Sequence, residues 1–128
     1  MTSAQRQSVR TRATDHCEYC RLRQDHAPFL RHQIEHVIPR QHRGSDLLSN
    51  LALACYHCNK YKGPNLSAFD PQTGRMVRLF NPRRHRWAEH FMLRRVLILG
   101  RTATGRATVE LLRMNAFRRQ TLRREIRP

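Results

Sequence analysis

The chain has 128 residues and a mean hydropathy of −0.74, which fits one domain with a modest core and excludes a fully disordered chain. Its 25 basic and 9 acidic residues give a formal net charge of +16, and only two of the basic residues are lysines. Because the planar guanidinium of arginine matches phosphate, this excess favours nucleic acid as the partner.

The first predicted element is a helix over residues 3–14, where Val9 and Ala13 lie four residues apart on one face. A tight turn follows at residues 17–20. Residues 29–37 alternate loosely between apolar and polar and include β-branched side chains, which predicts a strand.

The middle of the chain begins with a predicted loop at residues 39–49, which contain Pro, Gly, Ser and Asp. Residues 51–54 are a short apolar run, and periodicity leaves open whether they form a strand or a helical turn. Residues 56–62 are predicted to form a short helix, because Gly63 followed by Pro64 is a typical helix end.

A hairpin is predicted next, with strands at residues 67–70 and 75–80. The turn at residues 71–74 ends in a glycine, which suits the position that needs a positive φ. The Asn-Pro pair that opens residues 81–92 is typical of a helix start and predicts a helix over that range.

The end of the chain is predicted to contain one strand and two helices. Residues 96–99 resemble a buried strand that Gly100 closes. Residues 106–114 and 116–127 are the predicted helices, and the second carries an almost continuous basic stripe.

The positive charge is uneven along the chain. Residues 65–128 contain fifteen basic and four acidic residues, whereas residues 1–64 contain ten basic and five acidic ones. We therefore expect the residues that bind an anionic partner to lie mainly in the second half. Two alternatives to nucleic-acid binding stay open. A GC-rich genome would favour arginine over lysine, although it would not account for the scarcity of acids, and the partner could be an acidic protein.

No repeat and no linker interrupts the sequence, so we predict a single domain over residues 1–128. It would comprise an N-terminal helix or arm (1–16), a core (17–63) and a basic extension with a hairpin, a strand and helices (64–128). The N-terminus lacks the apolar run of a signal peptide, and no stretch approaches the ~18 apolar residues of a membrane span. We therefore expect a cytoplasmic protein with reduced thiols and no membrane partner.

All four cysteines stand in two Cys-x-x-Cys pairs, Cys17/Cys20 and Cys55/Cys58, separated by the 34 residues 21–54. Each pair places two sulfurs on one tight turn, and four thiolates complete a tetrahedral zinc shell with no open position, which predicts a structural zinc. The gap exceeds the ~15–20 residues of a simple zinc ribbon, so the metal would close around an insert large enough for a hairpin. A redox dithiol or two unrelated thiol pairs are the alternatives.

Glu35 and His36 stand among the apolar residues Ile34, Val37 and Ile38. A carboxylate in such a strand needs a partner or a metal ion. Because neighbouring strand residues point to opposite faces, a bulge or a distortion at the strand end would be needed for both side chains to serve one site. The alternative is that Glu35 pairs with a local arginine while His36 packs in the core.

The ordered set of Cys-x-x-Cys, Glu-His-x-Ile-Pro-Arg, Ser-Asn-Leu and Cys-x-x-Cys-Asn-x-x-Lys-Gly resembles the zinc-bearing HNH endonuclease family over residues 17–63. The later residues are similar to an extension found on some bacterial members. The resemblance implies an α+β fold: a small ββα-metal core, made of a β-hairpin plus a helix, stapled by the four-cysteine zinc site, with an α/β C-terminal extension.

The resemblance also implies roles for single residues. His36 would be the general base that activates water, and Asn50 would brace the loop that orients it. Glu35 takes a position usually held by Asp and Asn59 one often held by His, and both would be ligands of a catalytic divalent ion. Oxygen ligands suit Mg²⁺ or Mn²⁺. The implied activity is metal-dependent hydrolysis of DNA phosphodiester bonds.

Candidate nucleic-acid contacts are Arg40, Lys60 and Lys62, the two lysines following Asn59 on the predicted helix. Solvated surface charge is the alternative for these three residues. We expect double-stranded DNA as the partner. For the chain as a whole, the alternatives are a non-catalytic four-cysteine zinc module that binds nucleic acid, and an RNA-cleaving nuclease.

Overall fold

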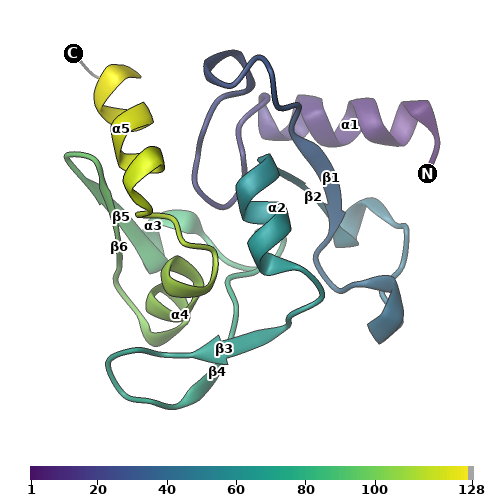
Figure 1. Cartoon of the computed structure of the whole chain (residues 1–128). Coiled ribbons are helices and arrows are strands. Elements are labelled where there is room, and N and C mark those ends of the chain that lie inside the picture. Colours follow the sequence, from purple (N-terminus) through teal and green to yellow (C-terminus); the bar gives the residue numbers. More distant parts are fainter. Residues whose placement is uncertain (127–128) are drawn as a thin grey trace. The chain divides into compact units, whose positions relative to one another are not determined.

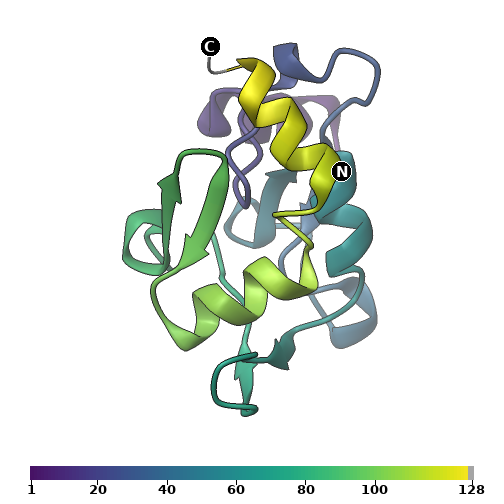
Figure 2. The same cartoon turned by 60° about the vertical axis from the view of Figure 1, so that its left-hand side comes forward.

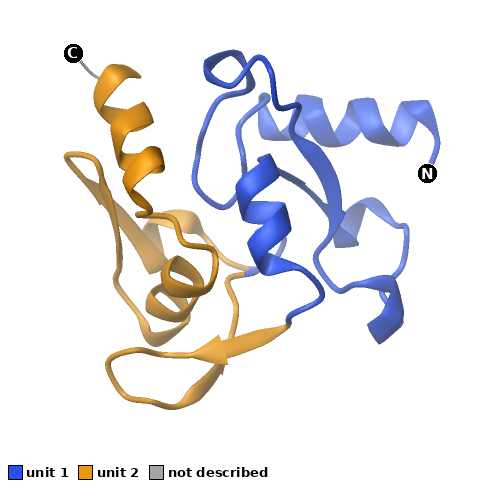
Figure 3. Cartoon of the chain, viewed as in Figure 1, with its two compact units in different colours: residues 1–65, 81–84 blue, residues 66–80, 85–128 orange. Residues whose placement is uncertain are grey.

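The computed structural model describes residues 1–126, and Figure 1 shows the order of its helices and strands. The mixed α+β architecture confirms the predicted fold class. None of the helices in the described part of the chain has the length and apolar character that a membrane crossing requires. The chain forms two compact units, which Figure 3 colours separately. Unit 1 comprises residues 1–65 and 81–84, and unit 2 comprises residues 66–80 and the chain from His85 onward; the single domain stays a prediction.

Helix α1 (Ser3–Ala13) opens unit 1 with a capping box. The Thr2 hydroxyl accepts a hydrogen bond from the Gln5 backbone N–H at 3.0 Å, and the Gln5 amide oxygen accepts one from the Thr2 backbone at 2.8 Å. Val9 and Ala13 are buried on one face of the helix, as the sequence predicts.

Two arginines of α1 hold the helix in place. The Arg12 guanidinium donates to the backbone carbonyls of Leu48 at 2.9 Å and Leu51 at 2.6 Å. Arg10 donates to the carbonyl of His32 at 2.9 Å. Because these guanidinium groups satisfy backbone acceptors, part of the arginine content serves the fold.

Strands β1 (Gln33–His36) and β2 (Leu51–Ala54) form an antiparallel hairpin. Glu35 lies opposite Ala52 in the register. Since side chains alternate along a strand, Glu35 and His36 project from opposite faces of this hairpin. The undecided run at residues 51–54 is therefore a strand.

The two faces of the hairpin meet different helices (Figure 1). One face packs on α1, and the other faces α2 (Tyr56–Lys62), which ends at Gly63 with φ 51° as predicted. The buried apolar cluster on the α1 side is small and is formed by residues of α1 and β2. It consists of Val9, Ala13, Leu51 and Leu53, with Met1 and Ile34 packed against it.

Strand β1 is shorter than the strand predicted for residues 29–37. Only its last four residues before Val37 pair with β2, and the Phe29 side chain is 96% exposed. The predicted loop after β1 contains two 3-10 turns, Arg40–His42 and Leu48–Asn50. A third such turn, Gln24–His26, lies before β1.

Unit 2 combines two hairpins with helices, and α4 packs on β6 (Figure 2). The predicted hairpin is confirmed, with Gly74 at φ 74° in its turn. The two predicted C-terminal helices are present, and the residue at which the second was expected to end, 127, lies outside the described residues. The elements are β3 (Ser67–Phe69), β4 (Met76–Arg78), α3 (Trp87–His90), β5 (Phe91–Arg94), β6 (Leu97–Gly100), α4 (Ala103–Leu111) and α5 (Phe117–Ile126).

The helix predicted over residues 81–92 is wrong. The Asn81 side chain accepts a hydrogen bond from the Arg83 backbone N–H at 2.9 Å, which is a local turn rather than a helix cap followed by a helix. The helix is confined to the single turn of α3, because Phe91 begins β5 and pairs with Gly100 of β6.

Buried polar contacts organise unit 2. Arg106 donates to both carboxylate oxygens of the buried Asp70 at 2.9 Å, and this holds the pKa of Asp70 well below its usual range. On α5, Arg119 donates to the carbonyl of Leu112 at 2.7 Å, and Arg123 donates to two carbonyls, those of Val96 and Met114. The basic stripe of α5 therefore includes side chains that fix the helix.

Candidate active site

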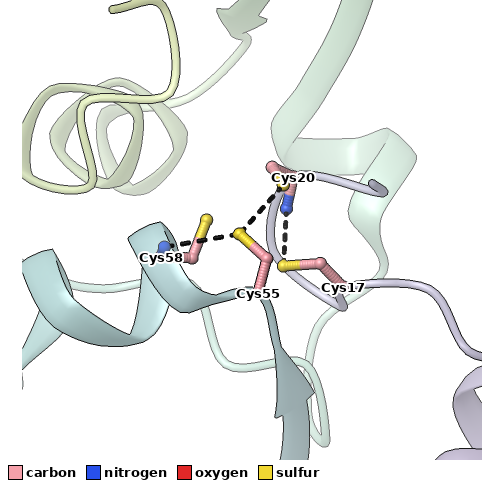
Figure 4. A group of neighbouring side chains, drawn as sticks. All are labelled: Cys17, Cys20, Cys55 and Cys58. Atoms are coloured by element: carbon pink, nitrogen blue, oxygen red, sulfur yellow. Dashed lines mark hydrogen bonds between the residues drawn. The ribbon is translucent and has the colours of Figure 1, made fainter. Parts of the chain in front are cut away.

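Four cysteines from two turns converge on one buried point of unit 1 (Figure 4). Cys17 and Cys20 come from the turn after α1, Cys55 is the N-cap of α2, and Cys58 lies in its first turn. All four ligand atoms lie within 4.8 Å of one another. The Cys20 N–H points at the Cys17 sulfur and the Cys58 N–H at the Cys55 sulfur, each at 3.4 Å. Such amides stabilise negative charge on sulfur.

This cluster fits zinc. At a Zn–S length of ~2.3 Å, the sulfurs of a tetrahedral site lie about 3.8 Å apart, and the Cys20 and Cys55 sulfurs lie 3.7 Å apart. Burial raises the pKa of Cys17 and Cys58 well above that of an ordinary thiol, whereas hydrogen bonding to Cys17 lowers the pKa of Cys55. A bound cation would compensate the cost of burying four thiolates.

The first cysteine turn is joined directly to the hairpin. The Glu18 backbone N–H donates to the Leu53 carbonyl at 2.8 Å, and the Glu18 carboxylate accepts from the Leu53 backbone N–H at 2.8 Å. Arg83 donates to the same carboxylate. These contacts align the turn with the end of β2 that leads into Cys55.

Glu35 is buried between the cysteine turn and α2. The Tyr19 hydroxyl donates to one of its carboxylate oxygens, and the Lys62 ammonium lies 3.2 Å from the other. Lys62 is 1% exposed and also donates to the Val37 carbonyl at 3.0 Å. Burial raises the pKa of Glu35, and Lys62 and Tyr19 oppose that rise. The partner of the buried carboxylate is thus a lysine, not the local arginine considered from the sequence.

His36 projects from the other face of β1 and meets Asp46 in the following loop. Its Nε2 lies 2.6 Å from the Asp46 carboxylate, which also accepts from the Arg40 guanidinium at 3.0 Å. The hydrogen bond from His36 and the contact with Arg40 hold the pKa of Asp46 below its usual range. An ionised carboxylate only accepts hydrogen bonds, so Nε2 of His36 carries a proton.

Asn50 closes this loop at its base. Its side-chain oxygen accepts from the Ile38 backbone N–H at 2.9 Å, and its amide donates to the carbonyls of Ile38 at 3.0 Å and Ser45 at 2.8 Å. Gly44 fits here because a Cβ at that position would collide with the Ile38 carbonyl. The three bonds fix the start and the middle of the loop, and hence the position of Asp46 beside His36.

One pocket of about 600 Å³ collects the side chains at the end of β1. Glu35, His36 and Asn59 line it together, although the first two leave β1 on opposite faces. The remaining lining comes from the N-terminus and α1, from β1 and the loop after it, and from the residues that follow α2: Met1, Arg6, Ile34, Pro39, Arg40, Gln41, Gly63 and Pro64. No bulge in β1 is needed for this meeting, because the pocket lies at the strand end.

The HNH endonuclease family matches residues 17–65, the segment that carries the cysteine cluster and most of the residues that line this pocket. Residues 17–65 are an HNH endonuclease domain. Searches of curated proteins and of solved structures give no significant match to the chain. The HNH domain contains the first cysteine turn, the β1–β2 hairpin and α2, and it excludes α1 and unit 2.

Within the HNH domain, the predicted nucleic-acid contacts occupy different environments. Arg40 lines the pocket and is exposed. Lys60 is exposed on α2, with its ammonium 6.0 Å from the Tyr56 ring centre and 5.8 Å from that of Tyr61. Lys62 is buried, and its ammonium is paired with the Glu35 carboxylate rather than exposed to a ligand.

The sequence predicts Glu35 and Asn59 as ligands of a catalytic ion, and both residues lie within the HNH domain. Glu35 and Asn59 line the same pocket, and a carboxylate with an amide oxygen suits Mg²⁺ or Mn²⁺. The Asn59 amide nitrogen donates to the side chain of Gln33, the first residue of β1. The residue types suit such an ion, which would have to share Glu35 with the Tyr19 hydroxyl and the Lys62 ammonium.

Sequence reasoning missed Asp46, Tyr19 and Arg6. Asp46 follows Gly44-Ser45 in a loop, and no local pattern links it to His36. Tyr19 stands inside the first cysteine pair, where no sequence pattern indicates its burial. The one available signal for Asp46 was the scarcity of acidic residues. Residues 1–64 contain five acidic residues and ten basic ones, so each carboxylate there is expected to have a cationic partner.

The buried pair of Glu35 and Lys62 gives a stability prediction. Lys62→Met should lower the free energy of unfolding by about 3–5 kcal/mol, because it leaves a buried carboxylate without its cation. Glu35→Gln combined with Lys62→Met should recover most of that loss. Urea unfolding followed by circular dichroism measures both variants. A double variant as unstable as Lys62→Met alone would contradict the pairing.

Proposed function

We propose that this chain is a metal-dependent endonuclease that hydrolyses DNA phosphodiester bonds with His36 as the general base. The observation that carries the proposal is the His36 imidazole, oriented by Asp46 at 2.6 Å, in a pocket lined also by Glu35, Asn59 and Arg40. Membership of residues 17–65 in the HNH endonuclease family supports nucleic acid as the substrate.

The pair of His36 and Asp46 indicates which nitrogen accepts the proton of the attacking water. With Nε2 donating to the Asp46 carboxylate, the lone pair of a neutral imidazole is on Nδ1. Nδ1 bonds no other group in residues 1–126. Asp46 would fix this tautomer and stabilise the imidazolium that forms when the proton arrives.

Charge on the phosphate is neutralised by residues of the same pocket. Arg40 brings a guanidinium next to His36, where it can bind a non-bridging phosphate oxygen. A divalent ion held by Glu35 and Asn59 would polarise the phosphoryl oxygen and stabilise the leaving 3′ oxygen. Asn50 would keep the loop that carries Asp46 and Arg40 in register with β1.

The cysteine cluster has a supporting role in this proposal. We infer that it holds a structural zinc, because four thiolates leave no coordination position for substrate. Tyr19 then links the zinc turn to Glu35, the residue next to His36. The net charge of +16 favours a polyanionic substrate over a small phosphate ester.

The assay that tests the proposal offers the purified protein supercoiled plasmid, single-stranded DNA and RNA, each with Mg²⁺, with Mn²⁺ and with EDTA. We expect nicked or linear plasmid in the presence of the divalent ion and intact plasmid in EDTA. Equal plasmid cleavage by a His36→Ala protein purified in parallel would refute His36 as the general base. Binding without cleavage of any substrate would support the non-catalytic module instead, and cleavage of RNA alone would support the ribonuclease.

A further inference from the structure

Helix α1 lies outside the matched HNH segment, yet it contributes to the wall of the pocket. Arg6 lines the pocket together with His36, Arg40 and Asn59, and Met1 lines it from the start of the chain. The guanidinium groups of Arg6 and Arg40 come from different elements, α1 and the loop after β1. The pocket therefore has a cationic wall of which the HNH segment supplies only one part.

The position of α1 at the pocket is fixed by contacts on three sides. Val9 is fully buried against the hairpin. Arg10 and Arg12 donate to backbone carbonyls of the segments around β1 and β2. Near its N-terminus, the Gln5 side chain donates to the backbone carbonyl of Asp46 at 3.4 Å. A helix held in this way presents Arg6 from a rigid support rather than from a mobile arm.

Arg6 differs from the two other arginines of α1 in what it bonds. Arg10 and Arg12 satisfy carbonyls of the fold. The Arg6 guanidinium has no hydrogen-bond acceptor and no acidic partner in residues 1–126, and it is exposed. Its five donors are thus available to a ligand in the pocket.

The acidic groups near the pocket are bonded by residues other than Arg6. The Glu35 carboxylate is bonded by Tyr19 and Lys62, and that of Asp46 by His36 and Arg40. The ligand that best suits an unpaired guanidinium beside an imidazole and a second arginine is an anion with several oxygens. A backbone phosphate has this chemistry.

We propose that Arg6 is a positioning residue that binds a backbone phosphate next to the scissile one, so that α1 completes the substrate site of the HNH domain. This inference rests on the proposed function, since it takes the ligand to be a nucleic acid. Arg6 and Arg40 then hold two points of one strand, which orients the scissile phosphate toward Nδ1 of His36.

Arg6→Gln tests the inference, with Arg31→Gln as the matched control. Arg31 is exposed, bonds no acceptor in residues 1–126 and lies outside the pocket, so its substitution removes the same charge without touching the site. Both substitutions are made in the His36→Ala background, and binding of a short fluorescent duplex is measured by anisotropy between 50 and 300 mM KCl. Phosphate contacts dominate affinity over about this range of salt concentration.

We expect Arg6→Gln to weaken binding about tenfold at low salt and to reduce the slope of log K against log salt by about 1, as for the loss of one phosphate contact. Arg31→Gln should weaken binding by less than about threefold, and Arg6→Lys should retain part of the affinity. Unchanged melting temperatures would show that α1 stays folded. Equal affinities for the Arg6→Gln and Arg31→Gln proteins would overturn the inference.

The same substitutions with His36 present separate this inference from the proposed function. Arg6→Gln should raise KM for plasmid or oligonucleotide cleavage more than it lowers kcat, because a flanking phosphate is bound in both the ground state and the transition state. Absence of cleavage by the otherwise native chain would refute the proposed function alone, since the anisotropy comparison does not depend on cleavage. A fall in kcat with KM unchanged would refute the positioning role of Arg6.

Discussion

His36→Ala is expected to lower the single-turnover rate of DNA cleavage by about 10²–10⁴-fold, the usual contribution of a general base. The substitution removes Nδ1, the nitrogen left with a lone pair when Nε2 donates to Asp46. Because the side chain is only 15% exposed, the melting temperature of the variant is measured beside the rate, so that a loss of folding is not counted as a loss of catalysis. The measurement is a time course of plasmid nicking with enzyme in excess, at matched zinc content.

Asp46→Ala refines that result. The imidazole would remain but lose the acceptor that fixes its tautomer, so the rate should fall less than for His36→Ala, by roughly 10-fold. Equal rates for the native chain and His36→Ala would exclude His36 as the base. An Asp46→Ala protein as slow as His36→Ala would assign the base function to the pair rather than to the imidazole alone.

Loss of one zinc ligand is the second large effect. Cys58→Ala should abolish binding of zinc at about one equivalent per chain and unfold the HNH domain, because zinc contributes about 10–16 kcal/mol to small sites of this type and a domain has only about 5–15 kcal/mol of net stability. The cluster joins the cysteine turn to the start of α2, and few apolar residues in unit 1 could replace it.

Zinc content by mass spectrometry and thermal melts by circular dichroism measure this loss. His57→Ala is the matched control, since His57 stands between Cys55 and Cys58 and is not one of the four clustered residues. It should keep one zinc per chain and a melting temperature close to that of the native chain. A Cys58→Ala protein that melts like the native chain would show that the cluster does not support the fold.

The core of the candidate site was predictable because its signals are local or strictly spaced. Two Cys-x-x-Cys pairs specify a cluster wherever the chain between them folds, and the fold brings those four residues together. The Gly63-Pro64 pair ended α2 as predicted. The hairpin followed from the need to bring residues 17–20 back to residues 55–58.

Other features depend on contacts that no local pattern encodes. Lys62 is two residues from Lys60, yet the first is buried and the second is exposed, because α2 places only Lys62 over Glu35. Asp46 reaches His36 only after Asn50 has bent the loop. The helix predicted for residues 81–92 failed because pairing of β5 with β6 outweighed a local helix-start signal.

Arginine side chains fasten helices in both units of this chain. Arg12 and Arg123 each donate to two backbone carbonyls at once, one pair in unit 1 and one in unit 2. A lysine carries its donors on a single nitrogen and lacks the rigid planar fork that lets one guanidinium hold two separate acceptors in a fixed geometry. The preference for arginine over lysine is therefore explained in part by hydrogen bonds within the fold, in addition to phosphate binding and genome composition. A variant with lysine in place of these arginines would keep the net charge that attracts DNA. It would lose the paired hydrogen bonds that hold the helices to the neighbouring backbone.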